Sequence, residues 1–152
     1  MRPSRPCLLS SLALLLAAGP LLAAPIDDAR TRIDGLRELG ASFKTVNDAQ
    51  RGPEVQTILL QMAARQIVNA SKAMPGWFPP GSGAESGAKT KAKPAIWQQP
   101  AKFKAAQDAF ARQALQFQRA AQAGLLPAIK TETRKLGLTC KGCHDSFRVP
   151  GK

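Results

Sequence analysis

Two of the three cysteines and the single histidine of this 152-residue chain lie together near its C-terminus, in the run Cys140-Lys-Gly-Cys143-His144. The pattern C-x-x-C-H is the attachment site of c-type haem. Thiols three residues apart share one face of a helix, so each can form a thioether with one vinyl group of the same porphyrin, and the next imidazole can supply an axial nitrogen. We therefore predict one covalent haem c, held by Cys140 and Cys143, with His144 as the iron ligand.

Three other kinds of site could use the same residues, and each fits less well. A structural zinc site needs four protein ligands, and the chain has no second cluster of cysteines or histidines. A thioredoxin-like redox pair belongs in a strand–helix–strand setting, which the sequence does not indicate. A plain disulfide between Cys140 and Cys143 would leave His144 without a role.

Four segments that can position this motif repeat apolar residues at helical spacing. A loop rich in glycine, proline and serine occupies residues 75–94, where Trp77 and Phe78 are expected to pin it to the rest of the protein. With no convincing strand, the sequence predicts an all-α fold: an antiparallel up-down four-helix bundle with a long loop between its second and third helices. The four stripes are Ala29, Ile33, Leu36, Gly40 and Phe43; Val55, Ile58, Leu59, Met62, Ile67 and Ala70; Phe103, Ala106, Phe110, Ala114, Phe117 and Ala121; and Leu126, Ile129, Thr133, Leu136, Cys140, Cys143 and Phe147.

The N-terminus has the layout of a secretory signal peptide. Arg2 and Arg5 precede an apolar run, and small residues follow it. We predict a cleaved signal over residues 1–24, which removes Cys7, and one haem-binding domain over residues 25–152. An uncleaved anchor is the alternative, although the apolar run is short for a membrane span. Because no second long apolar segment follows, the mature protein is expected in the periplasm and not across the membrane.

The chain is strongly basic. Its formal net charge is +12, which becomes +10 when Arg2 and Arg5 leave with the signal. An acidic redox partner protein or an anionic membrane surface would suit such a charge, although many of these lysines can simply be solvated helix faces. Nucleic acid is a poor candidate for the partner, because the predicted compartment is wrong, the lysines are dispersed and no recognition motif accompanies them.

Three blocks of the chain resemble the cytochrome c′ family of class II c-type cytochromes. They are "CKGCHDSFR" (residues 140–148), "TKAKPAIW" (residues 90–97) and "TRIDGLRELGASFK" (residues 31–44). The resemblance extends over the whole mature chain and implies a four-helix bundle that holds one haem near its C-terminus. It also implies that a homodimer can form, usually through faces of the first helix.

The resemblance also indicates what covers the distal side of the iron. In this family an apolar side chain from the first helix usually lies there, and the matching position is Leu36, with Leu39 and Phe43 further along the helix. Low-spin relatives place a methionine on this helix, and here there is none. Met62 and Met74 remain as candidate sixth ligands, with core packing as the alternative.

Two further family contacts are carried over by position. Arg32 matches an arginine that contacts the haem propionates, and Thr90 and Lys91 match a second contact region. Lys91 departs from the acidic residue common there, and Ile33 departs from the glutamine that often follows the arginine. These two departures put the propionate contacts in doubt.

The last charged residue of the motif region, Arg148, lies one helical turn after His144. Its cation could modulate the iron–histidine bond, or it could simply favour the helix C-terminus. With an apolar distal side, we expect a five-coordinate haem that binds NO and CO, transfers electrons, or both. The alternative is a six-coordinate, dedicated electron carrier. An enzyme is not expected, because no distal acid or base is evident.

Overall fold

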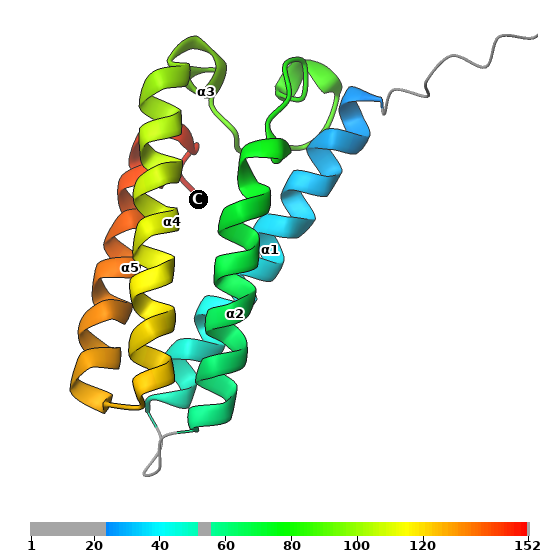
Figure 1. Ribbon diagram of the computed structural model, residues 1–152. Helices are drawn as coiled ribbons and strands as arrows, with labels where there is room; N and C mark the ends of the chain where they lie inside the picture. The colour runs from blue at the N-terminus through cyan, green and yellow to red at the C-terminus, as the bar shows by residue number, and fades with distance from the viewer. Residues whose placement is uncertain (1–23, 52–55, 152) are drawn as a thin grey trace, which may run out of the picture.

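The computed structural model describes residues 24–51 and 56–151, and it confirms the predicted bundle (Figure 1). Four long helices run side by side and are connected up and down, with a short helix and two 3₁₀ turns in the crossover between the second and third. The elements are α1 (Pro25–Ala49), α2 (Thr57–Ala73), η1 (Met74–Trp77), η2 (Ala84–Ser86), α3 (Ala95–Gln98), α4 (Pro100–Ala123) and α5 (Leu126–Phe147).

The ends of the helices follow from local sequence. Pro25 begins α1 with Asp27 and Asp28 in the first turn, where carboxylates favour the positive end of the helix dipole. Pro100 begins α4, and Gly124 ends it with φ 72°, a left-handed conformation that glycine adopts without steric cost. These local signals set where α1 and α4 begin and where α4 ends.

The bundle is closed on three of its four edges. Helix α1 packs on α2, α2 on α4, and α4 on α5. Helices α1 and α5 meet at one end, where Gln50 Nε2 donates a hydrogen bond to Thr133 Oγ1 at 3.0 Å. Nearby, a Cβ placed on Gly137 would lie 3.5 Å from the Phe43 ring. Beyond these contacts the two helices separate toward the opposite end, so the fourth edge is open there.

The long crossover loop is held against the bundle by side-chain packing and hydrogen bonds. Trp77 packs so closely on α1 that a Cβ on Gly35 would lie 2.7 Å from its ring, which makes glycine necessary there. The indole Nε1 of Trp97 donates to the carbonyl oxygens of Phe78 and Pro79, each at 3.1 Å. Trp77 and Phe78 both pack against the core, as the sequence predicted.

The apolar stripe predicted on α1 lies on a helix as expected, but most of its residues are not buried in the protein core. Among its members Ala29 is fully buried, whereas Leu36 and Gly40 are exposed at the open edge. The core instead draws on α2, α4 and α5, with Val46 and Ala49 from the far end of α1. An uncovered apolar section of a helical stripe is typical of a binding face.

Some sequence predictions fall outside the described residues. The proposed signal peptide lies in this part of the chain except for Ala24, and so does Val55 of the second stripe. Within residues 24–51 and 56–151, no helix combines the length and hydropathy needed to span a bilayer.

Candidate haem site

A cavity of about 570 Å³ lies between α1 and α5, at the edge where the two helices separate. One wall comes from α1, the opposite wall from α5, the floor from α4, and one side from residues 89–92 of the crossover loop. Its volume is in the range of pockets that enclose a cofactor. Apart from Met62, every residue that the sequence singled out for haem binding, from Arg32 to Arg148, lines this cavity.

The three residues of the C-x-x-C-H motif converge on the α5 wall. Cys140 and Cys143 are half-buried free thiols. Burial raises the pKa of both thiols, so each stays protonated until it reacts. Burial, together with the cation of Arg148, lowers the pKa of His144 despite the opposing charge of Asp145. The lowered pKa favours the neutral form of the imidazole, which is the form that can ligate iron.

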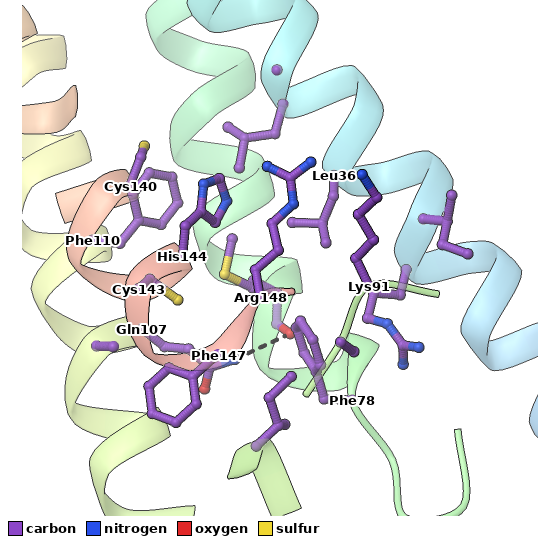
Figure 2. A pocket seen from close by; sticks show the side chains of 18 of the residues that line it. Leu36, Phe78, Lys91, Gln107, Phe110, Cys140, Cys143, His144, Phe147 and Arg148 are labelled. Atoms are coloured by element: carbon purple, nitrogen blue, oxygen red, sulfur yellow. Dashed lines mark hydrogen bonds between the residues drawn. The ribbon is translucent and has the colours of Figure 1, made fainter. Parts of the chain in front are cut away.

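The α1 wall opposite is apolar where it faces the motif. Figure 2 shows His144 and Arg148 projecting from α5 into the space between the helices, with Leu36 on the α1 side. Leu39 and Phe43 continue the same wall toward the end where the helices meet. Leu36 is 36% exposed, so its isobutyl group is not locked by neighbours and can be displaced.

Arg32 is the most unusual residue of the site, because it is a charged side chain that is 1% exposed. Its Nη1 donates to Ser82 Oγ at 2.7 Å and to the Trp77 carbonyl at 3.3 Å. Its Nη2 donates to the Ser82 carbonyl at 2.6 Å and to Thr90 Oγ1 at 3.3 Å. The guanidinium carbon also lies 5.2 Å from the centroid of the Phe78 ring. Arg32 thus fastens the crossover loop to α1 at three points.

This use of Arg32 bears on the propionate contact inferred from the resemblance. Burial lowers the pKa of Arg32, and the charges of Glu85 and Asp28 oppose that effect, so the group remains a guanidinium. Both of its terminal nitrogens already donate to the loop. The contact with a propionate stays a prediction, whereas the anchoring of the loop is visible in the geometry.

Replacing Arg32 with methionine should therefore destabilise the protein strongly. The fully buried Ser82 would lose the donor to both its hydroxyl and its carbonyl, and breaking a buried charged network costs about 3–5 kcal/mol. Thermal unfolding and limited proteolysis within residues 75–94 would report the loss. The matched control is Arg30→Met, because Arg30 is exposed and pairs with Asp27 on the same helix. Equal stability of the two variants would remove the anchoring role.

The cationic residues predicted from the motifs gather at one side of the cavity. Thr90 Oγ1 accepts hydrogen bonds from Arg32 and from the backbone N–H of Ala92. Lys91 and Arg148 are exposed, and both line the cavity beside Leu36 in Figure 2. Arg148 acts on His144 electrostatically, as its effect on the pKa of that imidazole indicates.

The two methionines weighed as sixth ligands lie in different places. Met62 is 47% exposed on α2 and is not among the residues that line the cavity. Met74 lines the cavity, but it is buried in the main core cluster at the end of α2. Its carbonyl oxygen accepts a hydrogen bond from Gln107 Nε2. Met74 is thus the one of the two that remains a candidate.

Sequence reasoning missed the contribution of α4 to the cavity. Three α4 side chains line the cavity: Phe103, Gln107 and Phe110. Figure 2 shows Gln107 and Phe110 beside the two cysteines. Phe103 also makes edge-to-face contact with Phe147, with ring centroids 5.0 Å apart. Phe103 and Phe110 were placed correctly on an inward stripe, but periodicity alone does not separate a side chain that fills a core from one that faces a cofactor.

The residues present fit a haem. Two thiols at the required spacing and a neutral imidazole share one cavity, whose walls are mainly apolar and whose side is cationic, as a porphyrin with two carboxylates requires. Among the described residues, no three His, Cys, Asp or Glu side chains are grouped so that they could hold a metal ion by themselves.

Comparison with known proteins shows which family the chain resembles. The family model described as Cytochrome C' matches residues 27–148. A cytochrome c' from Alcaligenes xylosoxydans xylosoxydans is 29% identical over 126 residues, which cover 83% of this chain and 96% of that protein. A cytochrome c' from Rubrivivax gelatinosus is 43% identical over 68 residues, or 45% of this chain. That second match spans 53% of the relative's length.

Solved structures of cytochromes c' have the same fold as this chain. The crystal structure of cytochrome c' from Rubrivivax gelatinosus superposes with a TM-score of 0.76 at 30% identity, covering 83% of this chain and 98% of that one. Cytochrome c' from Thermochromatium tepidum superposes equally well, with a TM-score of 0.76, at 23% identity, which bears on the fold alone. Because the family match runs from the first turn of α1 to Arg148 after α5, this chain is a member of the cytochrome c′ family of c-type cytochromes.

Proposed function

We propose that this protein is an exported cytochrome c′ with one haem, attached through Cys140 and Cys143 and ligated by His144, which binds NO and CO reversibly and can also transfer electrons. The haem supplies an iron centre for gas binding and one-electron exchange. The chain supplies everything else: covalent attachment, a neutral axial imidazole, and a distal wall that controls access. As support for gas binding, a ferrous variant of cytochrome c prime from Alcaligenes xylosoxidans has been solved with bound NO.

The observation that carries the proposal is the apolar wall that α1 presents opposite His144. The α1 side chains that line the cavity are Arg32, Ile33, Leu36, Arg37, Leu39 and Phe43. The two arginines are engaged elsewhere: Arg32 holds the loop, and Arg37 pairs with Asp34. The remaining wall offers neither a ligand to the iron nor a hydrogen bond to a polarised ligand. Such a wall favours a five-coordinate iron that takes neutral diatomic gases.

The alternative is a six-coordinate electron carrier with Met74 as the distal ligand. Met74 keeps this possibility open because it lines the cavity. Its burial in the core at the end of α2 favours the packing role, since a ligand would have to leave that cluster. An enzymatic role has less support, because the described cavity lining includes no carboxylate and no histidine besides His144.

Spectra of the purified ferric protein distinguish the two functions. The five-coordinate proposal expects a high-spin EPR and optical spectrum, and a ferrous form that takes up CO without losing another ligand. A low-spin spectrum with the charge-transfer band of a methionine–iron bond would overturn it. The variant Met74→Leu should leave the high-spin spectrum unchanged under the first proposal and abolish the band under the second.

We further propose that the protein is periplasmic. The N-terminal signal-like sequence and the requirement for thioether formation on exported chains support this placement. Fractionation of cells that express the full-length chain is the direct test. Recovery of the haem-bearing protein in the cytoplasm would contradict the proposal.

A homodimer is the last part of the proposal, and we place it on α2 rather than on the first-helix faces that the family resemblance implies. One solved relative is described as a cytochrome c' with ligand-controlled dimer dissociation. Here Ile58, Leu59 and Met62 lie exposed on one face of α2, which makes that face the candidate interface. Ile58→Asp should weaken the dimer at least about tenfold, or about 1.4 kcal/mol, in sedimentation equilibrium. The control is Leu125→Asp, an equally exposed apolar site at the α4–α5 turn. A protein that is monomeric at all concentrations would refute the dimer.

A further inference from the structure

The mouth of the cavity is ringed by positive charge. Arg37, Lys89, Lys91 and Arg148 line the cavity, and all four are exposed; we call them the cationic rim. Within the described residues, no aspartate or glutamate lines this cavity. The positive charge is therefore concentrated where the proposed haem would be most accessible from solvent.

The backbone fixes two members of the rim beside each other. The residues after α5 pair with the end of the crossover loop, so that Ala92 and Arg148 form an antiparallel bridge. Val149 N–H donates to the Lys91 carbonyl at 2.8 Å, and Lys93 N–H donates to the Phe147 carbonyl at 2.9 Å. The backbones of Lys91 and Arg148 are thus held side by side, and both residues line the same cavity.

The charges of the rim are only partly balanced. Arg37 pairs with Asp34, but the ion pairs in the described part of the chain leave out Lys89, Lys91 and Arg148. The two carboxylates of one haem would offset two of these three charges. The mouth would then remain positive, and the exposed apolar side chains of Leu36 and Val149 lie at the same edge. Apolar groups surrounded by charge are typical of protein interfaces.

We propose that the cationic rim is the docking surface for an acidic electron-transfer protein, an inference that rests on the proposed haem function. Electron exchange requires close approach to the cofactor, and this face is where the cavity opens. A local positive field steers an acidic partner and raises its association rate by about 10- to 1,000-fold at low salt. A hollow ringed by charge favours a shaped protein partner over a flat lipid surface.

The test uses the haem-loaded ferrous protein and two oxidants of opposite charge, hexacyanoferrate(III) and a cationic cobalt(III) complex. Lys91→Glu is compared with Lys130→Glu, which makes the same change in net charge at an exposed site outside the cavity. The readout is the ratio of the two oxidation rates in stopped flow, because a change in reduction potential moves both rates in the same direction. At low salt we expect Lys91→Glu to lower the anionic-to-cationic ratio at least about tenfold, and Lys130→Glu less than about twofold.

Salt and binding measurements complete the design. The difference between the variants should shrink near 1 M salt, where the screening length is about 3 Å. Polyglutamate, as an acidic polypeptide probe, should bind the wild type more tightly than Lys91→Glu in calorimetry, and anionic phosphatidylglycerol vesicles should not discriminate between them. Equal rate ratios for the two variants would overturn the docking surface while leaving the haem function intact. Discrimination by vesicles but not by polyglutamate would overturn the protein partner in favour of a membrane. A colourless protein would instead refute the proposed function itself.

Discussion

Replacing Cys143 with serine is expected to abolish stable haem retention. Cys143 lines the cavity on the same wall as Cys140 and His144, and one of the two thioether bonds is lost with its sulfur. The product should carry haem weakly, through a single bond, or lack it. Haem staining after denaturing electrophoresis and acid extraction of the pigment both measure covalent attachment directly.

The matched control for this variant is Lys141→Ser. Lys141 lies between the two cysteines, is exposed, and pairs with Asp145, so its loss should cost little stability and leave the motif spacing intact. We expect full covalent attachment in this control. Covalent haem in Cys143→Ser at the level of the wild type would contradict the expectation that both thioethers are needed for stable retention.

Replacing Leu36 with alanine is expected to open the distal side of the haem. Leu36 stands on the α1 wall of the cavity across from His144, so under the proposed function an incoming gas would have to displace its side chain. Removing three carbon atoms should raise both the association rate and the affinity for CO by about tenfold or more, which corresponds to about 1.4 kcal/mol. Stopped-flow mixing of the ferrous protein with CO measures both quantities.

Leu138→Ala is the matched control for the distal variant. Leu138 lies on α5, is 65% exposed, and is not among the residues that line the cavity. The same side-chain truncation there should leave CO binding unchanged. If Leu36→Ala also left CO binding unchanged, the steric gate would have to be another residue of the wall, and Leu39 and Phe43 would be the next to test.

The helices and the C-x-x-C-H motif could be predicted because their signals are local. Pro25, Pro100 and Gly124 set helix ends through their own backbone preferences, and the motif lies within one helical turn. The α1 stripe was also predicted as helical, but periodicity does not report what lies opposite it. Its middle section faces a cavity because α1 and α5 separate, and that separation depends on how the whole bundle packs.

The role of Arg32 could not be derived from local sequence. Its partners Trp77, Ser82 and Thr90 come from a glycine- and proline-rich loop whose path depends on tertiary contacts. The backbone hydrogen bond between Val149 and Lys91 likewise joins segments that are distant in the sequence, and no sequence pattern predicts it. The family resemblance placed Arg32 and Lys91 near the haem, but it did not indicate which groups they would bind.

The most direct test of the account is the intact mass of the protein purified from cells that export it and mature c-type cytochromes. The account predicts the mass of the chain without its signal plus one haem, with the added mass on the peptide that contains Cys140 and Cys143. A mass equal to the polypeptide alone, or haem carried on any other peptide, would contradict it.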